Sequence, residues 1–148
     1  MLVGLSALRG ASFHVTAGGI AWFVAGTLLF TVFMYGVAET LASRISKQEE
    51  YIGTPPAVAI LPFFLAGALY PIHAMPSALT TIAKLLPLTH TVARVRYALV
   101  DPSGRGLHEI WGISNVTLEA SLSLAVVAAF AIAFSVLSIL VFSRSAVR

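Results

Sequence analysis

The chain has 148 residues, of which 58% are hydrophobic and only 10% are charged, and its mean hydropathy is +0.92. Because soluble domains of this size carry about a quarter charged residues, this composition excludes an ordinary soluble protein and indicates an all-α integral membrane protein. The net charge of +3 comes from basic residues scattered at the ends of apolar runs, so it predicts no nucleic-acid partner. The absence of cysteine excludes disulfides and thiolate metal sites.

The first predicted membrane span covers residues 17–38, a run of about 22 residues without a charge, which is long enough to cross the hydrocarbon core. Small residues recur on it at every fourth position and predict a close contact with another helix: Ala17, Ala21 and Ala25. Glu39 ends the run. Residues 1–16 are apolar but too short to span, and we interpret them as the end of a helix followed by a loop.

Residues 41–53 are the most polar part of the chain and predict a short loop with charges of both signs. A second span is predicted over residues 55–74. Thr54 can cap its helix, and the two prolines that follow are tolerated in a first helical turn. Pro62 lies inside this span and predicts a kink, because proline removes one backbone hydrogen bond.

Residues 76–100 are largely apolar, yet they cannot form a lipid-facing span, because they carry His90 and Arg94 and are broken at Pro87. The pieces on either side of Pro87 would be helices of roughly 16 and 20 Å, against a hydrocarbon core of about 30 Å. We therefore predict a re-entrant helical hairpin that returns to the side from which it enters and packs against protein. Its predicted structural breaks are Pro71, Pro76 and Pro87.

Residues 101–117 are rich in glycine and polar side chains and predict a loop. The third predicted span covers residues 120–143, with a second stripe of small residues: Ser121, Ala125, Ala129 and Ala133. Basic residues follow both the first and the third span, and on these flanks the positive-inside rule predicts a cytoplasmic C-terminus: Arg44, Lys47, Arg144 and Arg148. This orientation leaves the other basic residues outside or within the hairpin: Arg9, Lys84, Arg94, Arg96 and Arg105.

Three ionisable side chains are candidates for a transport pathway or a gate. Glu39 is a carboxylate at the end of a span, where it either has a function or only marks the helix end at the level of the headgroups. His90 and Arg94 are four residues apart and share one helical face. They either line a polar vestibule or hold the hairpin at its depth in the membrane.

No motif for covalent chemistry is present in the sequence. There is no GxxxxGK[ST] phosphate-binding loop, so ATP hydrolysis is expected on a separate chain. His108-Glu109 begins a pattern like HExxH, but Gly112 occupies the place of the second histidine. Acid, base and nucleophile do not converge, and we predict no catalytic residue, no metal and no cofactor.

The run from residue 61 to residue 99 resembles the C-terminal signature of the ABC-2 type permeases, the membrane subunits of a class of ATP-driven exporters. The matching features come in the same order and spacing: Ala66-Gly67, Tyr70-Pro71, Pro76, and Pro87-Leu88-Thr89 leading to Arg94 or Arg96. The motif LPLTH is similar to the branch that exports nodulation factors and lipo-oligosaccharides, and the daunorubicin-type drug exporters share the rest.

This resemblance implies a six-span fold with a re-entrant hairpin on the outer face between the fifth and sixth spans. The three spans predicted here then correspond to the last three, and residues 1–148 form a single membrane domain of an incomplete permease. The implied partners are a cytoplasmic ABC ATPase subunit, a second permease copy in a homodimer or heterodimer, and membrane lipid. The resemblance also implies that the protein resides in the plasma membrane and that its substrate is an amphipathic drug or a lipid-linked saccharide.

A second hypothesis comes from a different class of protein. The chain is short, and on this hypothesis it is a small membrane protein that does not transport. It would dock on a larger complex through the two stripes of small residues.

Overall fold

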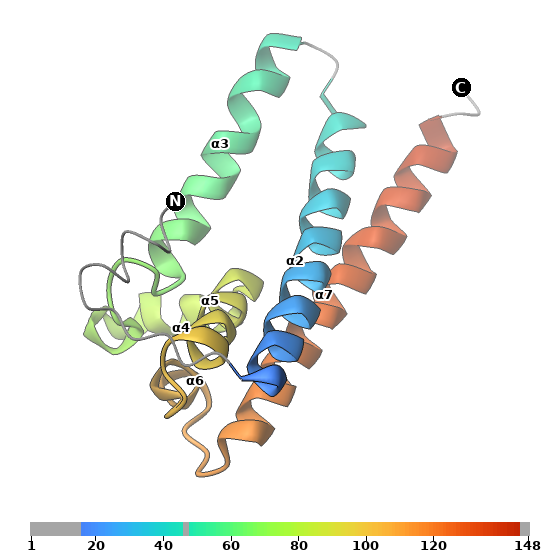
Figure 1. The fold of residues 1–148 in the computed structure, drawn as a ribbon. Helices are drawn as coiled ribbons and strands as arrows, with labels where there is room; N and C mark the ends of the chain where they lie inside the picture. Colours follow the sequence, from blue (N-terminus) through green and yellow to red (C-terminus); the bar gives the residue numbers. More distant parts are fainter. Residues whose placement is uncertain (1–15, 46–47, 146–148) are drawn as a thin grey trace, which may run out of the picture.

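The computed structural model describes residues 16–45 and 48–145, and every regular element in these two ranges is helical (Figure 1). The elements are α2 (Ala17–Ala42), α3 (Gln48–Leu65), the 3₁₀ turn η1 (Ile72–Ala74), α4 (Ser77–Leu85), α5 (Pro87–Leu99), α6 (Arg105–Trp111) and α7 (Val116–Ser145). The helix end and loop predicted before residue 16 lie outside the described residues.

The two longest helices, α2 and α7, lie side by side and run in the same direction (Figure 1). Helix α3 runs back in the opposite direction, and α4, α5 and α6 gather at the end of the molecule where α2 and α7 begin. The connection from α2 to α3 therefore lies at the same end as the C-terminal end of α7. Among the described residues, α2 and α7 are long and apolar enough to cross a membrane, and α3 contains a shorter apolar segment.

Both long helices begin at a polar cap. The Thr16 hydroxyl accepts a hydrogen bond from the Gly19 backbone N–H at 3.0 Å, and the Asn115 side chain accepts one from the Leu118 N–H at 3.1 Å. Each cap satisfies a backbone N–H that the first turn of a helix leaves without an intrahelical partner.

Glycines allow α2 to approach its neighbours closely. A Cβ atom at Gly36 would lie 2.9 Å from the backbone of Phe134 on α7, and one at Gly19 would lie 2.4 Å from the Ala98 carbonyl oxygen on α5. Between these points Phe33 packs edge-on against Phe134, with ring centroids 5.2 Å apart. Close backbone approach at small residues is the usual way in which membrane helices gain packing energy.

The predicted stripes of small residues do not mediate these contacts. On α2, Ala17 and Ala21 are exposed and Ala25 is only partly buried. On α7 all four members of the second stripe are exposed on the surface of this chain: Ser121, Ala125, Ala129 and Ala133. The contact within the chain uses glycines instead, and the role of the stripes in helix packing stays a prediction about contacts with another chain.

The predicted polar loop over residues 41–53 is much shorter in the structure. Helix α2 continues to Ala42, and α3 already begins at Gln48. The prediction was wrong here because it followed polarity, whereas glutamine and glutamate are good helix formers and can extend a helix beyond its apolar part.

The second predicted span ends earlier than expected. Helix α3 stops at Leu65, and Gly67 follows with a φ of +72°, a left-handed conformation that favours glycine and commonly ends helices. Residues up to 74 form a turn and η1 rather than more helix. Pro62 lies inside α3, and its carbonyl still accepts the Ala66 N–H at 2.8 Å.

The three prolines of the predicted hairpin each lie at the start of an element. Pro71 precedes η1, Pro76 precedes α4, and Pro87 is the first residue of α5. Leu86 between the two hairpin helices is extended, with φ −78° and ψ 129°, as expected for a residue before proline. The structure therefore has two short helices separated at Pro87, while their depth in a membrane stays a prediction.

The predicted loop over residues 101–117 contains a helix that the sequence analysis missed. Helix α6 has seven residues and is bounded by Gly104 and Gly112, which both have a positive φ. Its buried side chains join a core that links η1 and the helices from α4 to α7: Ile72, Ala83, Ala93, Leu107, Ile110 and Ala120. A helix this short forms through tertiary packing, so its local sequence carries little signal.

Candidate functional site

Arg94 is buried between α5 and α2. Only 1% of the residue is exposed, and its Nη2 donates a hydrogen bond to the Trp22 carbonyl oxygen at 3.0 Å. The guanidinium also lies over the Trp22 ring, with Cζ 5.0 Å from the ring centroid, in a cation–π contact. Gly26 makes room for it, since a Cβ atom there would lie 2.7 Å from Arg94 Nη1. Arg94 therefore docks α5 onto the backbone of α2.

The charge of Arg94 is poorly compensated within the described part of the chain. Its Nε and Nη1 atoms are buried and have no hydrogen-bond partner there, and it forms no ion pair with a described side chain. A buried charge without a counter-charge is costly, because its desolvation is not offset. The aromatic face and one carbonyl are thus the contacts that hold this cation in place.

His90 of α5 takes part in a polar network that joins α4, α5 and α6 to α7. Its Nε2 lies 2.9 Å from the Lys84 carbonyl oxygen on α4, and its Nδ1 lies 3.2 Å from the Ser123 hydroxyl on α7. The same hydroxyl accepts a hydrogen bond from the Trp111 indole N–H of α6 at 2.8 Å. The four groups form one buried polar network, and only 1% of His90 is exposed.

The donors and acceptors of this network are all satisfied when His90 is neutral. A backbone carbonyl only accepts, so His90 Nε2 carries a hydrogen. The Ser123 hydroxyl, which accepts from the Trp111 indole N–H, can also give its own hydrogen to His90 Nδ1. The neutral Nε2–H tautomer satisfies every member of the network, which is the condition under which buried polar groups specify one packing arrangement.

Glu39 lies far from the two hairpin residues. It occupies the last turns of α2, where its Oε2 accepts a hydrogen bond from the Ser138 hydroxyl of α7 at 2.7 Å. His90 and Arg94 belong to α5, at the opposite end of the molecule (Figure 1). The structure thus brings His90 and Arg94 into one hairpin and leaves Glu39 in the contact between α2 and α7.

Glu119 is a buried carboxylate that the sequence analysis did not single out. It is fully buried in the first turn of α7, where its Oε1 accepts the Ile113 N–H at 2.8 Å and lies 3.3 Å from His108 Nδ1. Its Oε2 has no hydrogen-bond partner among the described residues. An acidic residue shortly after a capping asparagine is a sequence signal for a helix start, and it could have revealed this role.

A large apolar cavity of about 710 Å³ lies between α2, α3 and the break between α4 and α5. Its walls include Phe30 and Leu41 of α2, Phe63 of α3, Pro87 at the break and Phe134 of α7. No charged residue lines it, and the hydroxyl of Thr40, which also lines it, is bonded to the Gly36 carbonyl oxygen. Glu39, His90 and Arg94 are not part of its lining.

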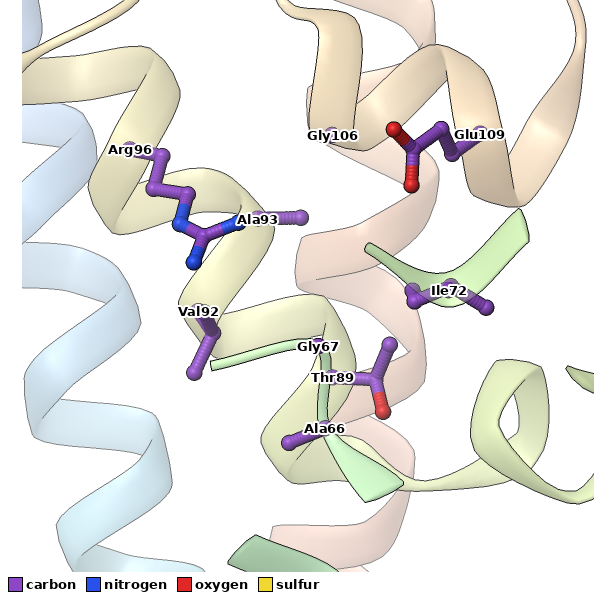
Figure 2. Close-up of a pocket in the computed structure, with 9 residues that line it drawn as sticks. All are labelled: Ala66, Gly67, Ile72, Thr89, Val92, Ala93, Arg96, Gly106 and Glu109. Carbon is purple, nitrogen blue, oxygen red and sulfur yellow. The ribbon is translucent and has the colours of Figure 1, made fainter. Parts of the chain in front are cut away.

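A second and much smaller cavity of about 10 Å³ lies between α5, α6 and the turn after α3 (Figure 2). Thr89 and Arg96 of α5 and Glu109 of α6 line it, together with Gly67 of the turn. Elsewhere, no three His, Asp or Glu side chains of the described residues gather closely enough to hold a metal ion.

The described part of the chain thus combines two helices long and apolar enough to cross a membrane with a hairpin held by buried polar side chains. The profile of the ABC-2 type transporter family matches residues 1–100, more than half of the sequence, and the chain belongs to this family. The resemblance to this family described above is thereby confirmed.

The chain is also similar to the Nodulation protein J of Sinorhizobium fredii (strain NBRC 101917 / NGR234). The two are 25% identical over 97 residues, which cover 62% of this chain and 37% of that protein. The chain thus matches little more than a third of the length of this relative. No solved structure matches the chain.

Proposed function

We propose that the chain is the permease subunit, or the C-terminal half of one, in an ATP-driven ABC-2 type exporter. The observation that carries this proposal is the family match over residues 1–100. The chain has no phosphate-binding loop, so a separate cytoplasmic ATPase would supply the energy. A second permease copy would complete the pathway, and the assembly would reside in the plasma membrane.

In this proposal α2, α3 and α7 each cross the membrane. The apolar part of α3, Ile52–Leu65, would be roughly 21 Å long, shorter than the hydrocarbon thickness of about 30 Å, so its crossing would rely on its flanking residues or on local thinning of the bilayer. Arg44 follows α2 at the end where α7 also finishes (Figure 1). The positive-inside rule then supports a cytoplasmic C-terminus and places the hairpin helices α4 and α5 toward the outer face.

The hairpin would act as the outer gate, and His90 and Arg94 would hold it closed. Both residues are buried in contacts with α7 and α2, which favours a positioning role over direct contact with the substrate. The apolar cavity supports an amphipathic substrate, because its volume of about 710 Å³ lies in the range of about 300–1,000 Å³ typical of ligand sites. The substrate's apolar part would occupy it.

Native mass spectrometry tests the proposed assembly. The chain would be tagged at its chromosomal C-terminus and extracted in mild detergent, so that chain mass and partners are measured together. We expect a stoichiometric ATPase and two permease copies, or an ATPase with a second membrane subunit if the permease is split. A chain of 15.6 kDa without any ATPase would refute the exporter proposal and favour the docking protein that does not transport.

Replacement of Arg94 by alanine tests the proposed gate. Loss of the guanidinium removes the hydrogen bond to Trp22 and the cation–π contact, so the hairpin would separate from α2 more readily. We expect export to fall while the amount of chain in the membrane stays normal. Normal export at a normal membrane level would exclude Arg94 from the gate.

A further inference from the structure

Helix α6 is held firmly on the side that faces α7. The Trp111 indole N–H donates a hydrogen bond to the Ser123 hydroxyl at 2.8 Å. The carboxylate of Glu119 is fully buried, accepts the Ile113 N–H at 2.8 Å and lies 3.3 Å from His108 Nδ1. Separation of α6 from α7 would leave these buried polar groups without partners, which is costly. The contacts therefore favour a fixed position of α6 on α7.

The contact of α6 with η1 is weaker. In the described part of the chain it has one polar pair, in which His73 Nδ1 lies 3.1 Å from Glu109 Oε1. The His73 side chain is 69% exposed, and exposed pairs contribute little because water competes for both groups. Figure 2 shows η1, labelled at Ile72, beside the helix that carries Glu109, and Ile72 is the buried apolar residue of η1 in the common core. The contact thus depends on one buried side chain and one exposed pair.

The segment that carries η1 begins at a flexible position. Helix α3 ends at Leu65, and Gly67 follows with a φ of +72°, which glycine adopts without a steric cost. Small residues at the end of an element are common hinges. Pro71 and Pro76, which flank η1, each have a fixed φ and stiffen the segment. The small cavity of about 10 Å³ lies between this segment, α5 and α6, so the packing beneath the segment is incomplete.

The far end of the segment is joined to α4. The Thr80 hydroxyl donates toward the carbonyl oxygens of Ile72 at 3.2 Å and of Met75 at 3.1 Å. The first turn of α4 is therefore expected to follow any movement of η1.

We propose that residues 67–76 form a lid that opens and closes over α6. Gly67 is its hinge, and the pair of His73 and Glu109 is its latch. Helix α6 stays on α7 in both positions of the lid. The lid is the moving part of the proposed outer gate, a role that rests on the proposed function, whereas its motion can be measured without transport.

Distances between spin labels on the detergent-purified chain test this motion. The chain has no cysteine, so labels attach only at introduced ones. Ala74→Cys with Arg105→Cys measures the distance from the lid to α6, and Arg105→Cys with Leu118→Cys measures the distance from α6 to α7. All three side chains are exposed. We expect two populations of distances for the first pair and one for the second. One population for both pairs, or two populations for the second pair, would overturn the proposal.

Glu109→Gln tests the latch, because it removes the charge and nearly keeps the shape of the side chain. We expect the ratio of open to closed lid to rise about 1.5- to 5-fold, as for the loss of an exposed pair. The distance between α6 and α7 should stay unchanged, which serves as the internal control. His73→Gln should have the same effect on the lid, and the double variant should add nothing to either single change. An unchanged ratio, or additive changes, would show that this pair is not the latch.

Reversible cross-linking tests the role of the lid in the gate. A short bifunctional methanethiosulfonate would join the cysteines at positions 74 and 105, and a reductant would release them. We expect export to stop when the lid is held and to recover on reduction, while the same reagent between positions 105 and 118 should have no effect. Normal export with the lid held would exclude it from the gate. If the unmodified chain exported nothing, the proposed function would fail, and the spin-label distances would still decide whether the lid moves.

Discussion

At the scale of single residues, the buried polar groups of this chain hold the hairpin rather than line the large cavity. Arg94 lies on the backbone of α2, and His90 is enclosed by groups from α4, α6 and α7. Gly26 leaves space for the Arg94 guanidinium, and Ser123 supplies the hydroxyl that bonds to His90.

Gly26 is the small residue of α2 that leaves space for the Arg94 guanidinium. Gly26→Ala would place a methyl group 2.7 Å from Arg94 Nη1 and force the guanidinium off the helix. We expect a loss of about 1–3 kcal/mol in unfolding free energy, as for other overpacked sites. Thermal unfolding of the detergent-purified variant measures this loss of stability.

Gly18→Ala is the matched control on the same helix, since a Cβ atom there would meet no other group within 4 Å. It should be neutral or stabilise slightly, because alanine favours helix more than glycine does. Equal losses in the two variants would show that Arg94 does not need the space at Gly26.

The pH dependence of stability tests the role of Asp101, which lies in the turn that leads to α6. Hydrogen bonds from the Ser103 hydroxyl and backbone lower the pKa of this carboxyl group, and Arg105 adds to the effect. Because the folded-state pKa lies below the unfolded value of about 3.9, the stabilisation is fully present above that value and is lost as pH falls through the folded pKa. Asp101→Asn should therefore make thermal stability less dependent on pH in this acidic range, and an unchanged acid profile would contradict the assignment.

At the scale of elements, the Ser123 hydroxyl of α7 forms hydrogen bonds to two other helices, α5 and α6. It accepts from Trp111 of α6 and bonds to His90 of α5, while it belongs to α7 itself. The short helix α6 also contacts α7 through His108 and Glu119. These polar contacts explain how a seven-residue helix keeps a defined position.

Ser123→Ala should destabilise the hairpin. It leaves both the Trp111 indole N–H and His90 Nδ1 without the hydroxyl, and each unsatisfied buried group costs about 1–3 kcal/mol. We expect the Ser123→Ala variant to show a lower Tm in thermal unfolding and faster proteolytic cleavage near α6.

Ser121→Ala is the control for this prediction. Its hydroxyl is exposed and bonds only to the Thr117 carbonyl oxygen of its own helix, so its loss should change the Tm little. If both serine variants behaved alike, the buried network would not contribute to stability.

At the scale of the whole molecule, the arrangement of the helices predicts which connections share a side of the membrane. The connection from α2 to α3 lies at the end where α7 finishes, and the connection from α6 to α7 lies at the other end (Figure 1). The proposed orientation places the first of these in the cytoplasm and the second outside.

Cysteine labelling checks this orientation directly, because the chain has no cysteine of its own. Ser114→Cys lies between α6 and α7 and should react with a membrane-impermeant maleimide in intact cells. Ser43→Cys follows α2 and should react only after the membrane is permeabilised. The opposite pattern would reverse the orientation, and labelling of both in intact cells would refute an odd number of crossings between them.

The sequence alone determined the membrane class, the family resemblance and the helix break at Pro87, because these depend on composition and on local properties of proline. It also identified His90 and Arg94 as unusual, since ionisable residues in apolar segments are rare. Only the tertiary structure decided their partners. Trp22 is 72 positions from Arg94 along the chain, and no local pattern connects residues so far apart. The positions of α6 and of the end of α3 were also decided by packing and by glycine turns, because short helices gain their stability from contacts made after the chain has folded.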